Sequence, residues 1–376
     1  MIDLEEKFGL HIVIDYFAAT FPFISHENDF ELKIIEDILM MVSNFLGYKK
    51  EDVTREDYAQ NRFQYQYIIG NDIILRLCGP KLKSGYKSCS IELKGQGCRS
   101  YENNNPDKTW QDLFEFFLVR MNAATSRFDV ALDDYSGKRI TIHEVKRKLD
   151  QGLYTTSFRE KDYTLFNSKK GMTLQFGSRT STQMLVIYEK LKEQLSQGIP
   201  CKQKYWVRYE MRFYKEKAHN ICMNILKNDK ESFRSYILGL LYDMLDLKEA
   251  SNLGDANLYK AKTYIKWRKF LEDVKKAKIE KYKIRISTHE TYYKWGRPLA
   301  ALFFLNILIH QKFDIDSTVI AIVRNGILAI DTIDQQKLKK LNQFLKESGL
   351  KKITISDLEI AKEKLEKYIE TEELPF

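Results

Sequence analysis

The same order of predicted elements occurs twice in the first 230 residues of the chain. Each time, a strand with an aspartate is followed by a helix, by two or more strands, by a strand with a glutamate, and by another helix. The acidic residues are Asp15 and Glu92 in the first half and Asp129 and Glu210 in the second. This order predicts a degenerate internal duplication, about 1–124 and 125–230, whose strands could join in one sheet.

Local signals mark several of these elements. Leu10–Phe17 is an apolar run typical of a buried strand, and Phe30–Phe45 has apolar residues at helical spacing. Alternation on both sides of a turn predicts a hairpin within residues 63–77. Thr141 and Glu144 have the spacing of a capping box, which predicts a helix that ends near Leu149.

Strand signals fade after about residue 230. Helical periodicity continues through five segments, namely Tyr236–Leu247, Tyr259–Lys276, Tyr292–His310, Ile333–Leu345 and Ile355–Ile369. We therefore predict an α+β protein with an antiparallel-sheet catalytic core of two related αβ units at 1–230. An all-helical region at 231–376 is a candidate for DNA binding or dimerisation.

The chain is basic, and its excess charge is concentrated in one segment. It has 61 Lys and Arg against 52 Asp and Glu, a net charge of +9 and a pI near 9.0. Tyr259–Arg285 alone holds 11 basic and 3 acidic residues among aromatic ones. The segment is either a solvated helix face over a buried aromatic stripe or a surface that follows DNA phosphates. The candidate DNA-binding residues in it are Lys262, Lys266, Arg268 and Lys269.

Several classes of site and location are disfavoured. The five cysteines are odd in number and never spaced as CxxC, which disfavours a disulfide framework or a zinc site. The acidic N-terminus has no apolar signal core and no stretch could span a bilayer, so we expect a cytoplasmic protein. There is no phosphate-binding P-loop, and no two of the six histidines are spaced as metal ligands. Any metal would therefore be held by carboxylates, which favours Mg²⁺ or Mn²⁺.

Two predicted strands carry more than one charge on a single face. Asp129 and Asp133 are four residues apart in one strand, so their side chains point to the same side. Glu210 shares a face with Arg208 and Arg212 in another strand. Such charges are either ordinary salt bridges or a functional site, and their number in apolar strands favours a site.

Three segments resemble the core motifs of a known family in order and spacing. They are Arg127–Asp133, Phe176–Ser181 with Ile187–Lys190, and Trp206–Glu210. The resemblance is to the Rep-trans family, the rolling-circle replication initiators of Gram-positive plasmids, with related relaxases of integrative conjugative elements. It covers about residues 85–225, and Asp15 and Gly95–Arg99 are also similar to a branch of that family from mobile elements.

The resemblance implies a role for individual residues. Tyr188 matches the nucleophile that attacks a DNA phosphodiester and forms a 5′-phosphotyrosine with a free 3′-hydroxyl. Asp129 and Glu210 match acidic ligands of Mg²⁺ or Mn²⁺, with Asp133 as a third. A free phenol has a pKa of about 10, so such a tyrosine needs activation.

Two arginines would contact the scissile phosphate, on the same resemblance. They are Arg179, from the Gly-Ser-Arg motif, and Arg208. One position departs from the family: Val186 stands where relatives often have a basic residue.

The sequence leaves several functions open. The first is a rolling-circle replication initiator that nicks and rejoins one DNA strand at an origin, and the second is a conjugative relaxase that uses the same chemistry at an origin of transfer. A non-enzymatic origin-binding protein and a metal-dependent hydrolytic nuclease are the alternatives of other classes. The family implies origin DNA, double- and single-stranded, a homodimer and a host helicase as partners.

Overall fold

The computed structural model describes residues 9–23, 31–82, 87–178, 180–227, 232–250, 255–281, 338–339, 342 and 352–371. The chain divides into two compact units. Met1–Leu82 and Tyr86–Lys283 form the first, and Lys83–Gly85 with Ile284–Phe376 form the second.

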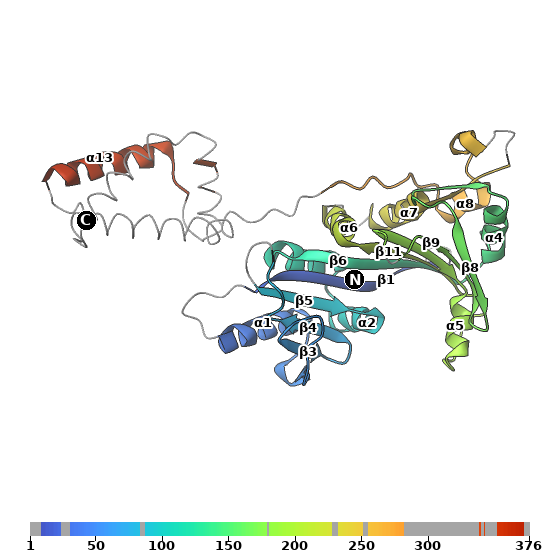
Figure 1. Cartoon of the computed structure of the whole chain (residues 1–376), viewed down its shortest axis with the longest axis horizontal. Coiled ribbons are helices and arrows are strands. Elements are labelled where there is room, and N and C mark those ends of the chain that lie inside the picture. Colours follow the sequence, from blue (N-terminus) through green and yellow to red (C-terminus); the bar gives the residue numbers. More distant parts are fainter. Residues whose placement is uncertain are drawn as a thin grey trace. The chain divides into compact units, whose positions relative to one another are not determined.

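A ten-stranded antiparallel sheet forms the frame of the first unit (Figure 1). The strand order is β2-β3-β4-β5-β1-β6-β11-β10-β9-β8. This confirms the α+β class with an antiparallel sheet. The strands are β1 (Leu10–Phe23), β2 (Val53–Arg55), β3 (Tyr65–Ile69), β4 (Ile73–Leu77), β5 (Lys87–Leu93), β6 (Ala124–Asp134), β8 (Tyr163–Ser168), β9 (Gly171–Phe176), β10 (Gln183–Tyr188) and β11 (Val207–Tyr214).

The two halves of the sheet are arranged as a pair of equivalent units around β1 and β6. β1–β5 lie on one side in the order β1-β5-β4-β3-β2, and β6 with β8–β11 on the other in the order β6-β11-β10-β9-β8. Glu92 of β5 is opposite Ala18 and Ile74, just as Glu210 of β11 is opposite Ala131 and Val186. This equivalence supports the internal duplication that the sequence predicts.

A β-bulge changes one detail of that equivalence. The register between β1 and β6 shifts between Ile14 and Tyr16, so that Asp15 has no partner in the ladder and Tyr16 pairs with Asp129. Counting from Ala18 and Ala131, the equivalent of Asp129 is Tyr16 rather than Asp15. The bulge is a tertiary feature that the linear pattern of acids does not contain.

Aromatic side chains fill the core on one face of the central strands. Phe17 of β1 contacts Phe114 and Phe117, with ring centroids 5.5 and 6.0 Å apart, and Phe114 meets Phe128 of β6 at 5.7 Å. All four rings are fully buried. The rings of residues 114 and 117 come from a helical segment formed by α3 (Trp110–Phe114) and the π-helical turn η2 (Glu115–Arg120).

Local signals predict two of the remaining helices of the two halves, α4 (Ile142–Asp150) and α1 (Glu31–Phe45). Thr141 caps α4 by accepting a hydrogen bond from the Glu144 backbone N–H, which confirms the predicted capping box. The predicted helix at Phe30–Phe45 is α1. The helices of the two halves also include α2 (Gly95–Asn104), α5 (Lys190–Ser196) and α6 (Lys215–Lys227).

The sheet-containing unit continues well past residue 230, where the sequence predicts a boundary. α7 (Ser232–Met244) leads into a short strand, β12 (Leu245–Leu247), which pairs with β7 (Tyr154–Thr156). After the 3-10 turn η3 (Asp255–Lys260), α8 (Ile265–Phe270) places Phe270 4.8 Å from the ring of Tyr209. The structure divides the chain after Lys283 because these apolar side chains complete the core of the first unit.

In the second unit the structure describes one long helix, α13 (Ile355–Thr371), close to the predicted segment. The predicted helix at 292–310 lies outside the described residues, and of the one at 333–345 only 338–339 and 342 are described. Among the described helices, none is long and apolar enough to cross a membrane.

Replacement of Trp267 by alanine tests whether α8 belongs to the sheet-containing unit. The Trp267 side chain is fully buried, and its Nε1 donates a 3.0 Å hydrogen bond to the Leu245 carbonyl. We expect Trp267→Ala to lower the free energy of unfolding by about 3–5 kcal/mol, measured by denaturant titration of the sheet signal. Ile265→Ala, on the exposed side of the same helix, is the control and should have little effect. An unchanged sheet transition in Trp267→Ala would contradict the extended unit.

Candidate active site

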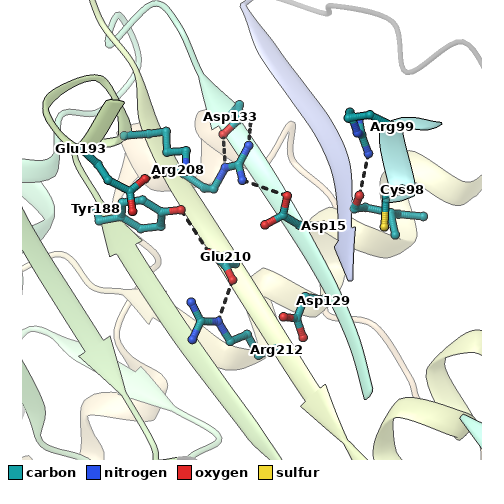
Figure 2. Close-up of polar contacts among 12 residues, drawn as sticks. Asp15, Cys98, Arg99, Asp129, Asp133, Tyr188, Glu193, Arg208, Glu210 and Arg212 are labelled. Carbon is teal, nitrogen blue, oxygen red and sulfur yellow. Dashed lines mark hydrogen bonds and ion pairs between the residues drawn. The ribbon is translucent and has the colours of Figure 1, made fainter. Parts of the chain in front are cut away.

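The charged residues of β6 and β11 form a row on one face of the sheet (Figure 2). Asp133 lies directly opposite Arg208, and Asp129 lies opposite Arg212. Glu210 lies between the two arginines on β11. The three carboxylates are almost completely buried, with Asp129 1%, Asp133 1% and Glu210 4% exposed. Buried charges are stable only when they are paired with opposite charges. The acids of this row therefore depend on the arginines beside them.

Arg208 is the centre of one part of this row. Its Nε and Nη2 donate hydrogen bonds of 2.7 and 2.8 Å to the two carboxylate oxygens of Asp133. Its Nη1 lies 3.2 Å from Asp15, which the bulge in β1 brings to this face. Burial lowers the pKa of Arg208, but the pairing with Asp133 outweighs it and raises the pKa above the ordinary value. Asp133 therefore orients Arg208, and both of its oxygens are engaged in doing so.

Asp129 is paired with Arg127 from its own strand. Arg127 Nη2 donates a 2.6 Å hydrogen bond to Asp129 Oδ2, and Arg127 Nε lies 3.1 Å from both oxygens. Burial raises the pKa of Asp129 to about 6, the arginine opposes this, and the charge of Glu210 adds to it. The negative charges of Asp129 and Glu210 therefore repel each other between neighbouring strands.

Tyr188 lies at the end of β10, opposite Arg208 of β11. Its hydroxyl donates a 3.2 Å hydrogen bond to Oε2 of Glu210, whose Oε1 accepts a 2.6 Å hydrogen bond from Arg212. Burial raises the pKa of Tyr188, the charge of Glu210 raises it further, and Arg208 opposes both. The phenol is therefore protonated at neutral pH and already in contact with a group that can accept its proton.

The carboxylates provide only part of a metal site. In the described part of the chain, no group of three or more His, Cys, Asp or Glu side chains is arranged to hold a metal ion. Asp129 and Glu210 lie on the same face of neighbouring strands. Both Asp129 and Asp133 accept hydrogen bonds from an arginine with both oxygens, but the Arg127 side chain at Asp129 is 32% exposed and that of Arg208 at Asp133 only 8%. Mg²⁺ is commonly held by one or two carboxylates together with phosphate oxygens of a substrate. The pair Asp129 and Glu210 fits an ion of that kind, and Asp133 does not complete the set.

Of the other predicted site residues, one lies outside the described residues and four lie apart from the row. Arg179 is outside the described residues, although its neighbour Ser178 forms a 2.8 Å hydroxyl contact with Thr180. The four basic residues proposed to contact DNA are all exposed, on or just before α8. α8 packs against Tyr209, whose side chain points to the opposite face from Arg208 and Glu210. The basic residues are Lys262, Lys266, Arg268 and Lys269.

Three residues of the site had no predicted role. They are Asp15, Arg127 and Arg212, which contact Arg208, Asp129 and Glu210 respectively. The alternation of side chains in the sequence already places Arg212 on the face of Glu210, and along β6 the same signal could have identified Arg127 on the face of Asp129. Nothing in the linear sequence indicates the bulge that brings in Asp15.

Comparison with known proteins agrees with this fold. A family model described as a replication initiation factor, Rep-trans, matches residues 123–314, just over half of the 376-residue chain. A second, described as the N-terminal domain of rolling-circle replication initiation proteins, matches residues 11–117.

Two individual proteins are similar. A Bacillus subtilis (strain 168) protein, provisionally named DNA relaxase NicK, is 29% identical over 224 residues, which are 57% of this chain and 58% of that protein. The chain thus spans little more than half the length of this relative. A solved structure of a rolling-circle replication initiator protein from Geobacillus stearothermophilus matches with a TM-score of 0.57 and 21% identity, over 73% of this chain and all of the other. This likeness concerns the fold.

The two family models and the similar proteins place the chain in the class that contains rolling-circle replication initiators and DNA relaxases. The chain belongs to the Rep-trans family of replication initiation factors.

The raised pKa of Asp129 predicts a pH dependence of stability. A carboxyl whose pKa rises on folding, from 3.8 to about 6, stabilises the folded state fully below the lower value, and this contribution is lost as the pH rises through the higher one. The stability of the wild-type protein relative to Asp129→Asn should therefore fall between about pH 4 and pH 7, by up to about 3 kcal/mol. Denaturant unfolding at several pH values measures this difference. Asp162→Asn, at an exposed position, gives the baseline, and parallel curves for wild type and Asp129→Asn would contradict the assignment.

Proposed function

We propose that the protein cleaves and rejoins one strand of DNA at an origin through a covalent bond to Tyr188, in the initiation of rolling-circle replication. The observation that carries the proposal is the hydrogen bond between the Tyr188 hydroxyl and Glu210, beside the buried guanidinium of Arg208. The end of the β10–β11 pair thus brings together the three groups that the reaction needs. Tyr188 is the nucleophile, Glu210 accepts its proton, and Arg208 is the cation for the phosphate. Membership of the replication initiation factor family supports the same role.

In the proposed reaction the Tyr188 oxygen attacks the phosphorus of one phosphodiester. The bond between that oxygen and phosphorus forms, and the bond from phosphorus to the 3′ oxygen of the preceding nucleotide breaks. The phenolic proton passes to Glu210, because the raised pKa of Tyr188 means that no phenolate exists beforehand. The departing 3′ oxygen takes a proton and becomes a 3′-hydroxyl, and the DNA end stays attached as a 5′-phosphotyrosine.

The arginines of the row stabilise charge during this step. Arg208 is held rigidly by Asp133 and Asp15, so its positive charge is in place before the phosphate arrives. Arg212 holds the other oxygen of Glu210 and fixes the direction in which Glu210 accepts the proton. Rejoining is the reverse attack by the 3′-hydroxyl, which regenerates Tyr188 and needs no nucleoside triphosphate.

We also propose that Asp129 and Glu210 hold one Mg²⁺ or Mn²⁺ ion together with the DNA phosphate. An ionised carboxylate has about four acceptor positions, so Glu210 can contact Tyr188, Arg212 and an ion. When bound, the ion would polarise the phosphate and offset the charge that develops on it. The structural support for this assignment is that both carboxylates lie on the face of the sheet that the Tyr188 hydroxyl reaches.

A conjugative relaxase is the second candidate, because the Bacillus subtilis relative is named as a DNA relaxase. It would use the same residues at an origin of transfer. The homodimer, the host helicase and the contribution of residues past 230 to origin recognition remain predictions. A non-enzymatic origin-binding protein and a hydrolytic nuclease are distinguished by the experiment that follows.

Replacement of Tyr188 by phenylalanine should abolish cleavage. Wild-type protein is incubated with Mg²⁺ and a supercoiled plasmid that carries the DNA adjoining its gene, and nicked circles and protein–DNA adduct are quantified. We expect Tyr188→Phe to lose both by several orders of magnitude, because the nucleophile is absent. Tyr163→Phe, a tyrosine of β8, is the control and should nick normally. Nicking that survives Tyr188→Phe would indicate a hydrolytic nuclease, and no nicking by wild type would indicate a binding protein.

Two aspartates should respond differently when the metal is titrated. Asp129→Asn should raise the Mg²⁺ or Mn²⁺ concentration for half-maximal nicking by at least about tenfold, because it removes a ligand. Asp133→Asn should slow nicking with little change in that concentration, because it disturbs Arg208 instead. An unchanged metal requirement in Asp129→Asn would contradict the proposed metal site.

A further inference from the structure

A cavity of about 700 Å³ lies beside the row of charged residues. Its walls come from both halves of the sheet: β1, β4 and the start of α2 from the first, and α5 and the start of β11 from the second. A volume of this size is typical of sites for small organic ligands. None of the roles proposed above for Tyr188, Glu210 and Asp129 uses this space.

The cavity is continuous with the surroundings of the nucleophile. Arg208 lines it and lies opposite Tyr188 in the sheet. Lys190 also lines it, and its Nζ lies 5.5 Å from the centre of the Tyr188 ring. A molecule in the cavity would therefore adjoin a phosphate under attack by Tyr188.

Four cationic side chains in the walls could contact an anion, and they belong to Lys94, Arg99, Lys190 and Arg208. The lining also has two carboxylates, and each cation has an acidic partner: Glu92, Glu102 and Glu193 for the first three, and Asp133 with Asp15 for Arg208. α2 begins at this wall with Gly95, and no side chain caps its first turn. A helix N-terminus of this kind attracts phosphate groups.

The same walls also offer contacts for a base. The indole of Trp206 lines the cavity, with the Arg208 guanidinium 5.8 Å from its centre. The amide of Gln194 presents both a donor and an acceptor at this wall. Aromatic faces that stack bases beside cations are a common way to bind single strands.

We propose that this cavity, the flanking-nucleotide pocket, holds one nucleotide of the single strand next to the phosphodiester that Tyr188 attacks. Its phosphate lies at the start of α2, near Lys94 and Arg99, and its base lies against Trp206. The inference rests on the proposed function, because it assigns a part of the same DNA substrate to this wall. It makes the first half of the duplicated sheet a contributor to substrate binding.

Binding and crosslinking in a Tyr188→Phe background test the pocket without any cleavage. The probe is an oligothymidylate of roughly 12 nucleotides, within the range that single-strand-binding surfaces follow, with 5-iodouracil at every base for photocrosslinking. We expect one of the crosslinked peptides, mapped by mass spectrometry, to contain Trp206. Crosslinks that all map outside the pocket, with binding intact, would overturn the inference.

Affinity measurements on the same probe give a second readout. Lys94→Ala should reduce the slope of log affinity against log salt by about 0.7, the value for one lost phosphate contact on a single strand. Trp206→Ala should weaken oligonucleotide binding about 5- to 150-fold. If Trp206→Ala folds poorly, the measurement on Lys94→Ala still tests the inference. Lys50→Ala, at an exposed lysine paired with Glu36 of α1, is the control and should change nothing. Equal slopes for Lys94→Ala and Lys50→Ala would overturn the inference.

A competition separates the DNA strand from a free nucleotide. If thymidine 5′-monophosphate blocks the Trp206 crosslink only at a large excess over the oligonucleotide, the pocket binds a nucleotide as part of a DNA strand. Tight binding of the monophosphate with no oligonucleotide crosslink at Trp206 would overturn it. Because all of these measurements use Tyr188→Phe, their failure is distinguishable from a failure of wild-type protein to nick.

Discussion

The pairing of β6 with β11 is the constraint on which the site depends. Asp133 and Arg208 face one another across these strands, and their bidentate contact is buried with both partners almost inaccessible to water. A shift of one residue in this pairing would turn every charge of the row into the hydrophobic core on the other face. Loss of one partner of such a buried pair typically costs about 3–5 kcal/mol, so the register and the charge row stabilise each other.

The duplicated sheet explains why one half carries the nucleophile and the other does not. Tyr188 lies two residues beyond the position opposite Glu210, and in the first half the equivalent position, two beyond Ile74 opposite Glu92, is Arg76. Arg76 forms a 2.9 Å ion pair with Glu92, which also accepts a hydrogen bond from Tyr16. The first half thus keeps the acid but surrounds it with a cation and a phenol from other strands. The first half contributes Asp15 and part of the walls of the cavity.

Much of this arrangement follows from local sequence, and the rest depends on tertiary register. The alternation of Asp129 with Asp133 and of Arg208 with Glu210 places each set on one face, and the Thr141 capping box predicts the start of α4. The bidentate contact that occupies Asp133 is set by strand pairing, so the sequence alone could not separate an arginine partner from a metal ligand. The same holds for the boundary near residue 230, since only the folded core shows that Trp267 packs under β11. The charge of the basic segment Tyr259–Arg285 is evident in the sequence. Only the structure shows that α8 of this segment lies on the face of the sheet opposite the site.

The most direct test is peptide mapping of the covalent adduct that wild-type protein forms with supercoiled plasmid carrying the DNA beside its gene. After digestion of protein and DNA, we predict one modified peptide, which contains Tyr188 linked through its oxygen to a 5′-phosphorylated nucleotide. An adduct on any other residue, or cleaved DNA with no protein attached, would contradict it.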